Sequence, residues 1–553
     1  MTKFKKIYRY ITASLCMLFL ATLIQAQSFN WVKRVGGPSN ENFTRMCADY
    51  SGNFYLAVAG GGPQLYFEND TLSVSGLNDM FIIKYNAIGN EIWKMKIGGP
   101  NTSVMPSFSE AITWMSFDSI SNCIFVSGIY YQTCSIDTIN LSASPSVSRG
   151  YLAKINMNGN VIWAKNFGSG FVSAPRFDTD KAGNLLMFFS ISNTGTLDTI
   201  PVTAGGYIGK LDTDGTIVFI KRICGLSPQF PWSVYSYQKI KVVNDLVYVY
   251  GGSYDSLTLD TIFLPSSNYY SVVASVWDTS GSIQWARQSN NSESGIGTMC
   301  IDNNHNLYVM DKFDGPFITF NTDTIFTNGT YGSYLLKFNK FGNLIWHKSY
   351  LTGGVRAVGA VIDSEGNAYF TGWFLDSLII DNFSLYSSTG IEELFIARFD
   401  SSGNCMGVRQ AGSASGYDIA ENSNGELYVA GTFRSTGTFG SISIPSYGSS
   451  DMFLANLSAI TGSGGNERIA NNQLIIYANP NKGSFRIKLP DALTDLTGAL
   501  LTVYDVQGKE VARFNLEQTS VHPQLEINNA IAGLYTVRLV KGKQVFNGKL
   551  VVE

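Results

Sequence analysis

The feature that most constrains the fold is a pair of strands that recurs along the chain and is out of phase at its two ends. A first strand, "FIIKYN" from Phe81, is followed by a tight turn and a second strand, "EIWKMK" from Glu91. Copies of the first strand begin near residues 81, 151, 207, 272, 334, 395 and 452, and a second strand follows the first six. The seventh copy has no partner after it, whereas "FNWVKRVGG" from Phe29 has no first strand before it. If these two ends pair, the sheets close into a ring without an unpaired edge.

A second hairpin separates successive copies, as in "CADYSGNFYLAVAG" from Cys47. Each repeat therefore holds four strands in about 56 to 70 residues, which is typical of the blades of a β-propeller. We expect an all-β chain with a seven-bladed β-propeller over residues 27–461, closed by the N-terminal strand. A Gly- and Asn-rich linker over 462–473 and a small Ig-like β-sandwich over 474–553 are expected to follow.

The repeated motifs also carry a resemblance. An Asp-x-x-Gly-Asn turn, an aromatic-apolar strand with Lys and a Gly-x-x-x-Trp hairpin follow one another, an order that resembles the bacterial beta-propeller repeat family. The resemblance implies the seven-bladed fold and no particular function. The Asp-rich turns lack the alternating carboxylates and final Glu of a calcium loop, so we expect turn chemistry there. Packing between blades is expected for the Trp residues of the second strands: Trp31, Trp93, Trp163, Trp285 and Trp346.

Charge and the N-terminal segment limit the class of protein. A net charge of −3 argues against a nucleic-acid-binding surface, which needs a basic patch. Residues 1–26 have the pattern of a signal peptide, because basic residues precede the short apolar run "ITASLCMLFLATLI" and Ala26 suits cleavage. We expect no membrane span in the mature chain.

The six cysteines of the mature chain have no metal-ligand spacing, and we expect mostly free, buried thiols, although export would permit disulfides.

The last 80 residues contain three motifs in order: Asn479-Pro480 with Gly483 and Phe485, Tyr504-Asp505 with Gly508-Lys509, and Gly533-Leu534-Tyr535. This order resembles the type A C-terminal sorting domain of the type IX secretion system, with Ala478 departing from the usual Pro. The resemblance implies a Bacteroidetes-type cell, an interaction of residues 474–553 with the secretion machinery, and a place outside the cell or on its outer surface. An ordinary sandwich binding module is the alternative.

The connections on one face of the predicted ring are long and variable, and we call this side the long-loop face. Binding residues concentrate on such loops, so we expect a glycan or protein ligand there. The candidate binding residues are aromatic: Phe230, Trp232, Trp373, Phe374, Tyr130 and Tyr131. The alternative is that they pack between blades.

We predict no catalytic residues, metal site or cofactor, and we expect binding rather than catalysis. Two other functions stay open: a secreted polysaccharide-degrading enzyme (glycosidase or lyase), and an adhesin or scaffold without a small-molecule pocket. Glu41, Glu110 and Glu293 lie at matching places before the first strand of a repeat, where acid–base pairs or structural roles are both conceivable.

An Asp-Ser/Thr-apolar sequence also recurs between repeats. It fits a repeated hairpin element, and it resembles the O-glycosylation signal of exported Bacteroidetes proteins. The resemblance implies sugars on five threonines: Thr71, Thr138, Thr199, Thr261 and Thr324.

Overall fold

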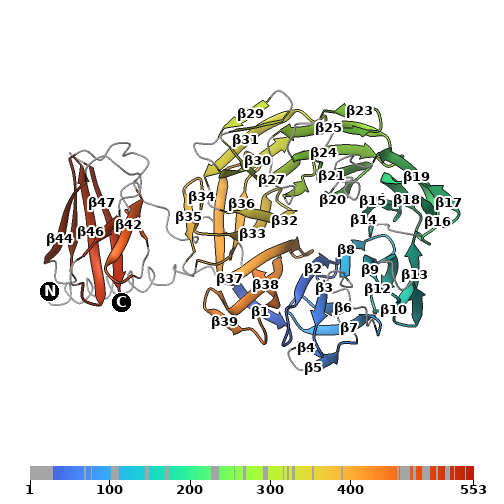
Figure 1. Cartoon of the computed structure of the whole chain (residues 1–553), viewed down its shortest axis with the longest axis horizontal. Helices are drawn as coiled ribbons and strands as arrows, with labels where there is room; N and C mark the ends of the chain where they lie inside the picture. Colours follow the sequence, from blue (N-terminus) through green and yellow to red (C-terminus); the bar gives the residue numbers. More distant parts are fainter. Residues whose placement is uncertain are drawn as a thin grey trace, which may run out of the picture. The chain divides into compact units, whose positions relative to one another are not determined.

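The computed structural model divides into two compact units, residues 1–465 and 466–553, and Figure 1 shows both. The structure describes residues 29–457, Ile460, 474–477 and 481–553. Short gaps interrupt these ranges at 68–69, 76–77, 101–110, 144–148, 169–173, 226–235, 254–255, 266–269, 291–296, 316, 321–322, 327–330, 352–353, 388–389, 489–497, 506–508, 517–523, 528–529 and 542–543. The predicted signal peptide and the whole of the predicted linker lie outside the described residues, and the domain bounds stay a prediction.

The first unit is a β-propeller of seven blades among the described strands, each with antiparallel strands a to d from the axis outward (Figure 1). The a strands are β2 (Asn42–Ala48), β8 (Ala111–Asp118), β14 (Arg176–Thr179), β20 (Ser236–Val243), β26 (Thr298–Ile301), β32 (Arg356–Ile362) and the second part of β37 (Cys405–Glu421). The b strands are β3 (Phe54–Gly61), β9 (Cys123–Tyr130), β15 (Leu185–Ile191), β21 (Leu246–Ser253), β27 (Leu307–Asp314), β33 (Ala368–Phe374) and β38 (Leu427–Phe439).

The outer half of each blade comes from the recurring strand pair. The c strands are β6 (Asn78–Tyr85), β12 (Arg149–Asn156), β18 (Gly205–Leu211), β24 (Ser271–Asp278), β30 (Tyr331–Phe338), β36 (Glu393–Phe399) and β40 (Asp451–Leu457). The d strands are β7 (Glu91–Gly98), β13 (Val161–Phe167), β19 (Ile217–Cys224), β25 (Ile283–Asn290), β31 (Leu344–Leu351), the first part of β37 and β1 (Phe29–Val35).

The chain ends of the ring pair as predicted. β1 runs antiparallel to β40, with Val32 opposite Ala455 and Val35 opposite Met452, so the N-terminal strand supplies strand d of the seventh blade. The N-terminal strand therefore supplies the missing partner of the seventh first strand, so that β40 is paired on both sides, with β38 and with β1.

A small hairpin follows strand b in each blade and accounts for most copies of the Asp-Ser/Thr sequence. β10 pairs with β7 of the preceding blade and β28 pairs with β25 in the same way, so a hairpin covers the outer edge of the neighbouring sheet. The hairpin strands are β4 (Gln64–Phe67), β5 (Asp70–Ser73), β10 (Thr133–Ile136), β11 (Ile139–Ser142), β16 (Gly195–Leu197), β17 (Ile200–Val202), β22 (Leu257–Leu259), β23 (Ile262–Leu264), β28 (Phe317–Phe320), β29 (Asp323–Phe326), β34 (Ser377–Ile380), β35 (Phe383–Tyr386) and β39 (Ile442–Pro445).

A repeated set of contacts joins each blade to the next at the face of the short turns. In the first blade, Lys84 Nζ and Trp93 Nε1 both donate to the Met157 carbonyl in the next blade's c–d turn, each at 3.0 Å. Gly159 of that turn has a φ of +86° and lies so close that a Cβ would sit 3.1 Å from the Trp93 ring. The predicted packing of these tryptophans between blades is confirmed, and the turn glycine is needed for both its backbone angle and its lack of a side chain.

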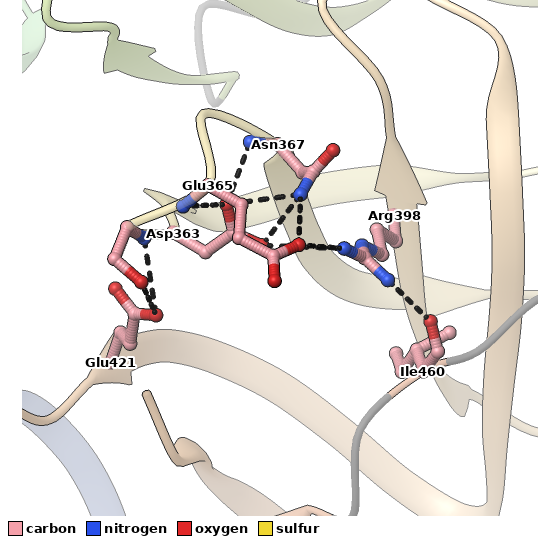
Figure 2. A network of polar contacts seen from close by, with 7 residues as sticks. Asp363, Glu365, Asn367, Arg398, Glu421 and Ile460 are labelled. Atoms are coloured by element: carbon pink, nitrogen blue, oxygen red, sulfur yellow. Dashed lines mark hydrogen bonds and ion pairs between the residues drawn. The ribbon is translucent and has the colours of Figure 1, made fainter. Parts of the chain in front are cut away.

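The contacts differ at the seam between blades six and seven, because β37 carries Gly407 opposite Arg398 and strand d of blade seven is the N-terminal strand β1. Figure 2 shows Arg398 in the place of the lysine: its Nη1 donates to the Ile460 carbonyl at 3.0 Å, and its Nη2 lies 2.9 Å from Glu365 Oε2. Asp363 Oδ1 accepts the backbone N–H of Glu365 at 3.0 Å and that of Asn367 at 2.7 Å. The turn aspartate thus satisfies its own backbone, as the turn interpretation expects.

The second unit is a small β-sandwich with one apolar core. One sheet holds β41 (Ile475–Tyr477), β42 (Ser484–Lys488) and β45 (Gln524–Glu526), and the other holds β44 (Glu510–Leu516), β43 (Ala499–Tyr504), β46 (Gly533–Lys541) and β47 (Gln544–Val552). Asn481, between the motif residues Pro480 and Gly483, donates its backbone N–H to the Val551 carbonyl at 3.0 Å and accepts from Glu553 at 2.8 Å, which ties this segment to the end of β47. The hydroxyl of the motif residue Tyr535 donates to the Ile531 carbonyl four residues upstream.

The six cysteines of the described residues are free thiols, four of them buried. Within the described part of the chain, no helix is long and apolar enough to cross a membrane, and no cluster of three metal-binding side chains occurs.

Candidate functional site at the axis of the ring

The a strands carry a repeated irregularity that directs side chains toward the axis of the ring. Among the described residues, five of them contain a register shift of the β-bulge type, and bulges re-aim the side chain that follows. The residue directly after each bulge, together with its counterparts in β14 and β26, forms a ring that we call the axial level. Its members are Arg45, Trp114, Arg176, Lys239, Thr298, Gly359 and Asp418.

Three side chains of the axial level form a stack. The Arg45 guanidinium lies 4.8 Å and the Arg176 guanidinium 5.5 Å from the Trp114 ring, so two cations from blades one and three meet an indole from blade two. Trp114 Nε1 donates to the Phe177 carbonyl at 2.5 Å, which fixes the ring plane. Cation–π contacts of this kind hold both guanidiniums near the axis.

Lys239 enters the axial level from blade four. Its Nζ donates to the Val358 carbonyl at 2.8 Å, which belongs to the bulge of blade six, so the side chain extends past blade five. Burial, together with the positive charges of Arg45 and Arg176, lowers the Lys239 pKa to about 7, while Asp418 acts in the opposite direction. Lys239 is in blade four, whereas Arg45 and Asp418 are in blades one and seven, which are not its neighbours. Their charges therefore act on Lys239 across the axis of the ring.

Asp418 supplies a carboxylate of the axial level. Its Oδ2 accepts the backbone N–H of Met46 at 3.1 Å, which ties blade seven to blade one. Burial lowers the pKa of Arg45, and the Asp418 charge acts against that shift. The carboxylate is therefore anchored on one side of the ring, beside Arg45.

A second carboxylate lies one level nearer the short turns. Asp178 accepts from Ser116 Oγ at 2.7 Å, from the Val242 backbone N–H at 2.9 Å and from Lys241 Nζ at 3.0 Å. The Asp178 charge raises the pKa of Lys241. The Lys241 side chain is nevertheless 57% exposed, which shows that water reaches the axis at this depth.

A further polar group lies toward the long-loop face, between blades six and seven. The Arg356 guanidinium is 5.2 Å from the ring of Trp373, which is half-buried at the end of strand b. Glu392 directly precedes β36 of the same blade, and its Oε2 accepts from Ser415 Oγ of blade seven at 2.9 Å. Trp373 is thus a predicted binding residue with an accessible surface and a cationic neighbour.

The other predicted aromatic residues are placed differently. Tyr130 and Phe374 are 0% exposed and Tyr131 is 6% exposed, so each would have to move to meet a ligand. Tyr130 donates to Asn166 and lies against Tyr151 within the blade. Phe230 and Trp232 lie outside the described residues.

The proposed glycosylation residues fall on the small hairpins. Thr138, Thr199 and Thr261 are exposed in two-residue turns whose preceding aspartates have positive φ, and Thr71 is exposed at the start of β5. Thr324 is half-buried.

Glu41 is fully buried between blades seven and one, and Glu110 and Glu293 lie outside the described residues.

The axial level was not predicted from the sequence. A usable signal exists, because in blades with an Asp-x-x-x-Asn turn these residues stand four positions before its Asp, as Arg45 does before Asp49 and Arg176 before Asp180. The mixture of charged and aromatic residues at one repeat position marks it as different from the positions that join the blades.

Comparison with known proteins bears mainly on the tail. Residues 475–553 match the family of secretion system C-terminal sorting domains. Over 157 residues the chain is 25% identical to an uncharacterized WD repeat-containing protein of Acanthamoeba polyphaga mimivirus, a match that spans 25% of this chain and 11% of that protein.

Similar solved structures include the Dos1 propeller, with 9% identity, 78% of this chain and 97% of that chain covered, and a TM-score of 0.36. Another is the polysaccharide lyase Uly1, with 11% identity, 76% and 90% covered, and a TM-score of 0.42. Likenesses this low add nothing to the fold shown by strand pairing. The sorting domain is informative, and it makes the protein a cargo of type IX secretion that is delivered to the cell surface or the extracellular space.

Proposed function

We propose that the protein is an exported binding propeller whose ligand, a glycan in the first instance, docks at the axis from the long-loop face. The observation that supports the proposal is the convergence of Arg45, Trp114, Arg176, Lys239 and Asp418 from five blades at one level. A site assembled from so many separate segments is held by the whole ring, which is how rigid scaffolds present binding groups.

Binding is favoured over hydrolysis by the arrangement of the carboxylates. A glycosidase needs two carboxyl groups on either side of the scissile bond. Asp418 stands in the axial level, whereas Asp178 lies in the level below and already accepts from Ser116, Val242 and Lys241. The described axial residues thus offer one carboxylate that is suitably placed.

Elimination is a second candidate, favoured by one observation. A lysine whose pKa is lowered to about 7 and that has two guanidiniums near it can serve as a general base at neutral pH. In a uronate polysaccharide, Lys239 Nζ would take the proton next to the carboxylate. The bond from the neighbouring ring carbon to the glycosidic oxygen would break, leaving a carbon–carbon double bond, and the leaving oxygen would take up the proton that Lys239 had accepted. An increase in ultraviolet absorbance on incubation with polygalacturonate would reveal this reaction.

The binding proposal is tested with a glycan array probed by the full chain and by an Arg176→Met variant. We expect one class of glycan to be bound and the variant to lose most of the signal. A Lys181→Met variant is the matched control, because Lys181 is 61% exposed and lies in the a–b turn on the short-turn face, five residues after Arg176. Equal binding by both variants would remove the axis as the site, and no binding to any glycan would direct the search to a protein ligand.

A further inference from the structure

The axial level brings more positive than negative charge together among the described residues. Arg45, Arg176 and Lys239 lie within mutual electrostatic range, and Asp418 is the carboxylate that acts on Lys239 at this level. Like charges gathered in a partly buried place raise the free energy of the empty protein, and an anionic ligand would relieve that cost.

We infer that the axial level binds the carboxylate or sulfate groups of an acidic polysaccharide, an inference that rests on the proposed function. The two guanidiniums are the main recognition groups. Each is planar and presents paired N–H donors that match the oxygens of a carboxylate or sulfate. Trp114 is fixed by its hydrogen bond to Phe177 and lies against both of them, so their positions are set before a ligand arrives.

Lys239 provides a third cation from another direction. Its ammonium group has three donors, one of which goes to the Val358 carbonyl. The pKa of Lys239, lowered to about 7, means that an anion bound beside it would also stabilise its charged form. A ligand group that meets Arg45 and Arg176 would therefore find a further donor across the axis.

The depth of the site favours a slender chain over a folded partner. Water reaches Lys241 one level below, where the side chain is 57% exposed, so the axis is solvated at that depth. The axial residues lie inside the ring of a strands, where the flat surface of a folded protein cannot reach them. A linear polysaccharide with repeated acidic groups satisfies both the charge and the shape.

The test compares binding of the full chain to three polysaccharides at constant ionic strength: polygalacturonate, dextran sulfate and neutral dextran. Variants Lys239→Met and Lys239→Arg are measured beside the control Lys181→Met, and thermal unfolding verifies that each variant is folded. We expect at least one acidic polysaccharide to bind and dextran not to bind. Lys239→Met should weaken binding about tenfold or more, Lys239→Arg by about threefold at most, and Lys181→Met not at all.

The two acidic probes distinguish carboxylate from sulfate as the group recognised. Binding of dextran as tightly as dextran sulfate would overturn the inference and leave the proposed function standing, as would equal losses in Lys239→Met and Lys181→Met. Polyglutamate is measured as a fourth probe, and its binding without that of any polysaccharide would overturn the inference, because the ligand would then be an acidic polypeptide. Failure to bind any polysaccharide, neutral or acidic, would instead contradict the proposed function itself.

Discussion

The closure of the ring should depend on pH through one buried glutamate. Glu41 and Asp451 are both 0% exposed and lie between blades one and seven, next to the end of β1. A Cβ on Gly36 would sit 2.1 Å from the Asp451 carboxyl carbon, and one on Gly37 would sit 3.0 Å from Glu41 Oε1. The backbone therefore packs directly onto two carboxyl groups. The perturbation we propose is Glu41→Gln, which removes the charge and keeps the shape.

The size of the effect follows from the pKa. Burial, with a contribution from the nearby Asp451 charge, raises the Glu41 pKa from 4.5 to about 7. At ~1.4 kcal/mol per tenfold change, ionised Glu41 costs the folded protein about 3 kcal/mol. Because the folded pKa is raised, the native state binds more protons than the unfolded chain between pH 4.5 and 7. Stability from this group is complete below pH 4.5 and is lost as the pH rises to about 7.

Guanidinium unfolding followed by tryptophan fluorescence measures this directly, because all nine tryptophans lie in the propeller segment. Glu41→Gln should be about 3 kcal/mol more stable than the parent near pH 8 and nearly equal to it near pH 4.5. The control is Glu91→Gln at the exposed start of β7, where the surface ion pair of Glu91 with Lys94 contributes at most about 1 kcal/mol. A difference between Glu41→Gln and the parent that does not change with pH would refute the reasoning.

Two further predictions concern the blade contacts and the hairpins. Trp285 Nε1 donates to the Lys340 carbonyl at 2.9 Å, and Val276 stands opposite it where other blades have a lysine that also donates. The Met157 carbonyl, by contrast, accepts from both Trp93 and Lys84, so it retains one hydrogen bond if Trp93 is changed. Trp285→Phe should therefore destabilise the propeller by about 1 kcal/mol more than Trp93→Phe in denaturant unfolding, and equal losses would contradict the hydrogen-bond argument. Mass spectrometry of the secreted protein should find sugars on the exposed hairpin residues Thr138, Thr199 and Thr261, and unmodified peptides covering all three would end that proposal.

The fold could be predicted because its signals are local and repeated. The lysine at the place of Lys84 donates to the next blade's turn carbonyl in three blades, and the tryptophan at the place of Trp93 does so in four. The one irregular copy could also be predicted from the sequence: the two strands of the seventh pair lie at opposite ends of the repeat array, and β1 pairs with β40. Periodic alternation and turn chemistry determine such features within a few residues.

The site could not be predicted in the same way, because no short segment contains it. The direction of Arg45 depends on a bulge in β2, and its meeting with Lys239 depends on the curvature of the entire ring. For two of the aromatic residues predicted to bind, the position along the chain was right but the direction of the side chain was not. Tyr130 and Phe374 end their strands on the long-loop side, as expected, but alternation along the strand points them into the blade, where they are buried.

The contrast between repeated and varied positions gives a way to separate the two kinds of residue within one chain. Positions that join blades hold the same residue in most copies: the lysine in four blades of seven and the tryptophan in five. The axial level holds Arg, Trp, Arg, Lys, Thr, Gly and Asp in positions that are geometrically equivalent. A fold built from equal blades gives no reason for such variety, since any small polar residue would fill the position equally well. The variety is what an asymmetric ligand requires of a symmetric scaffold, and this reasoning directs the first binding experiments to the axis rather than to the rim.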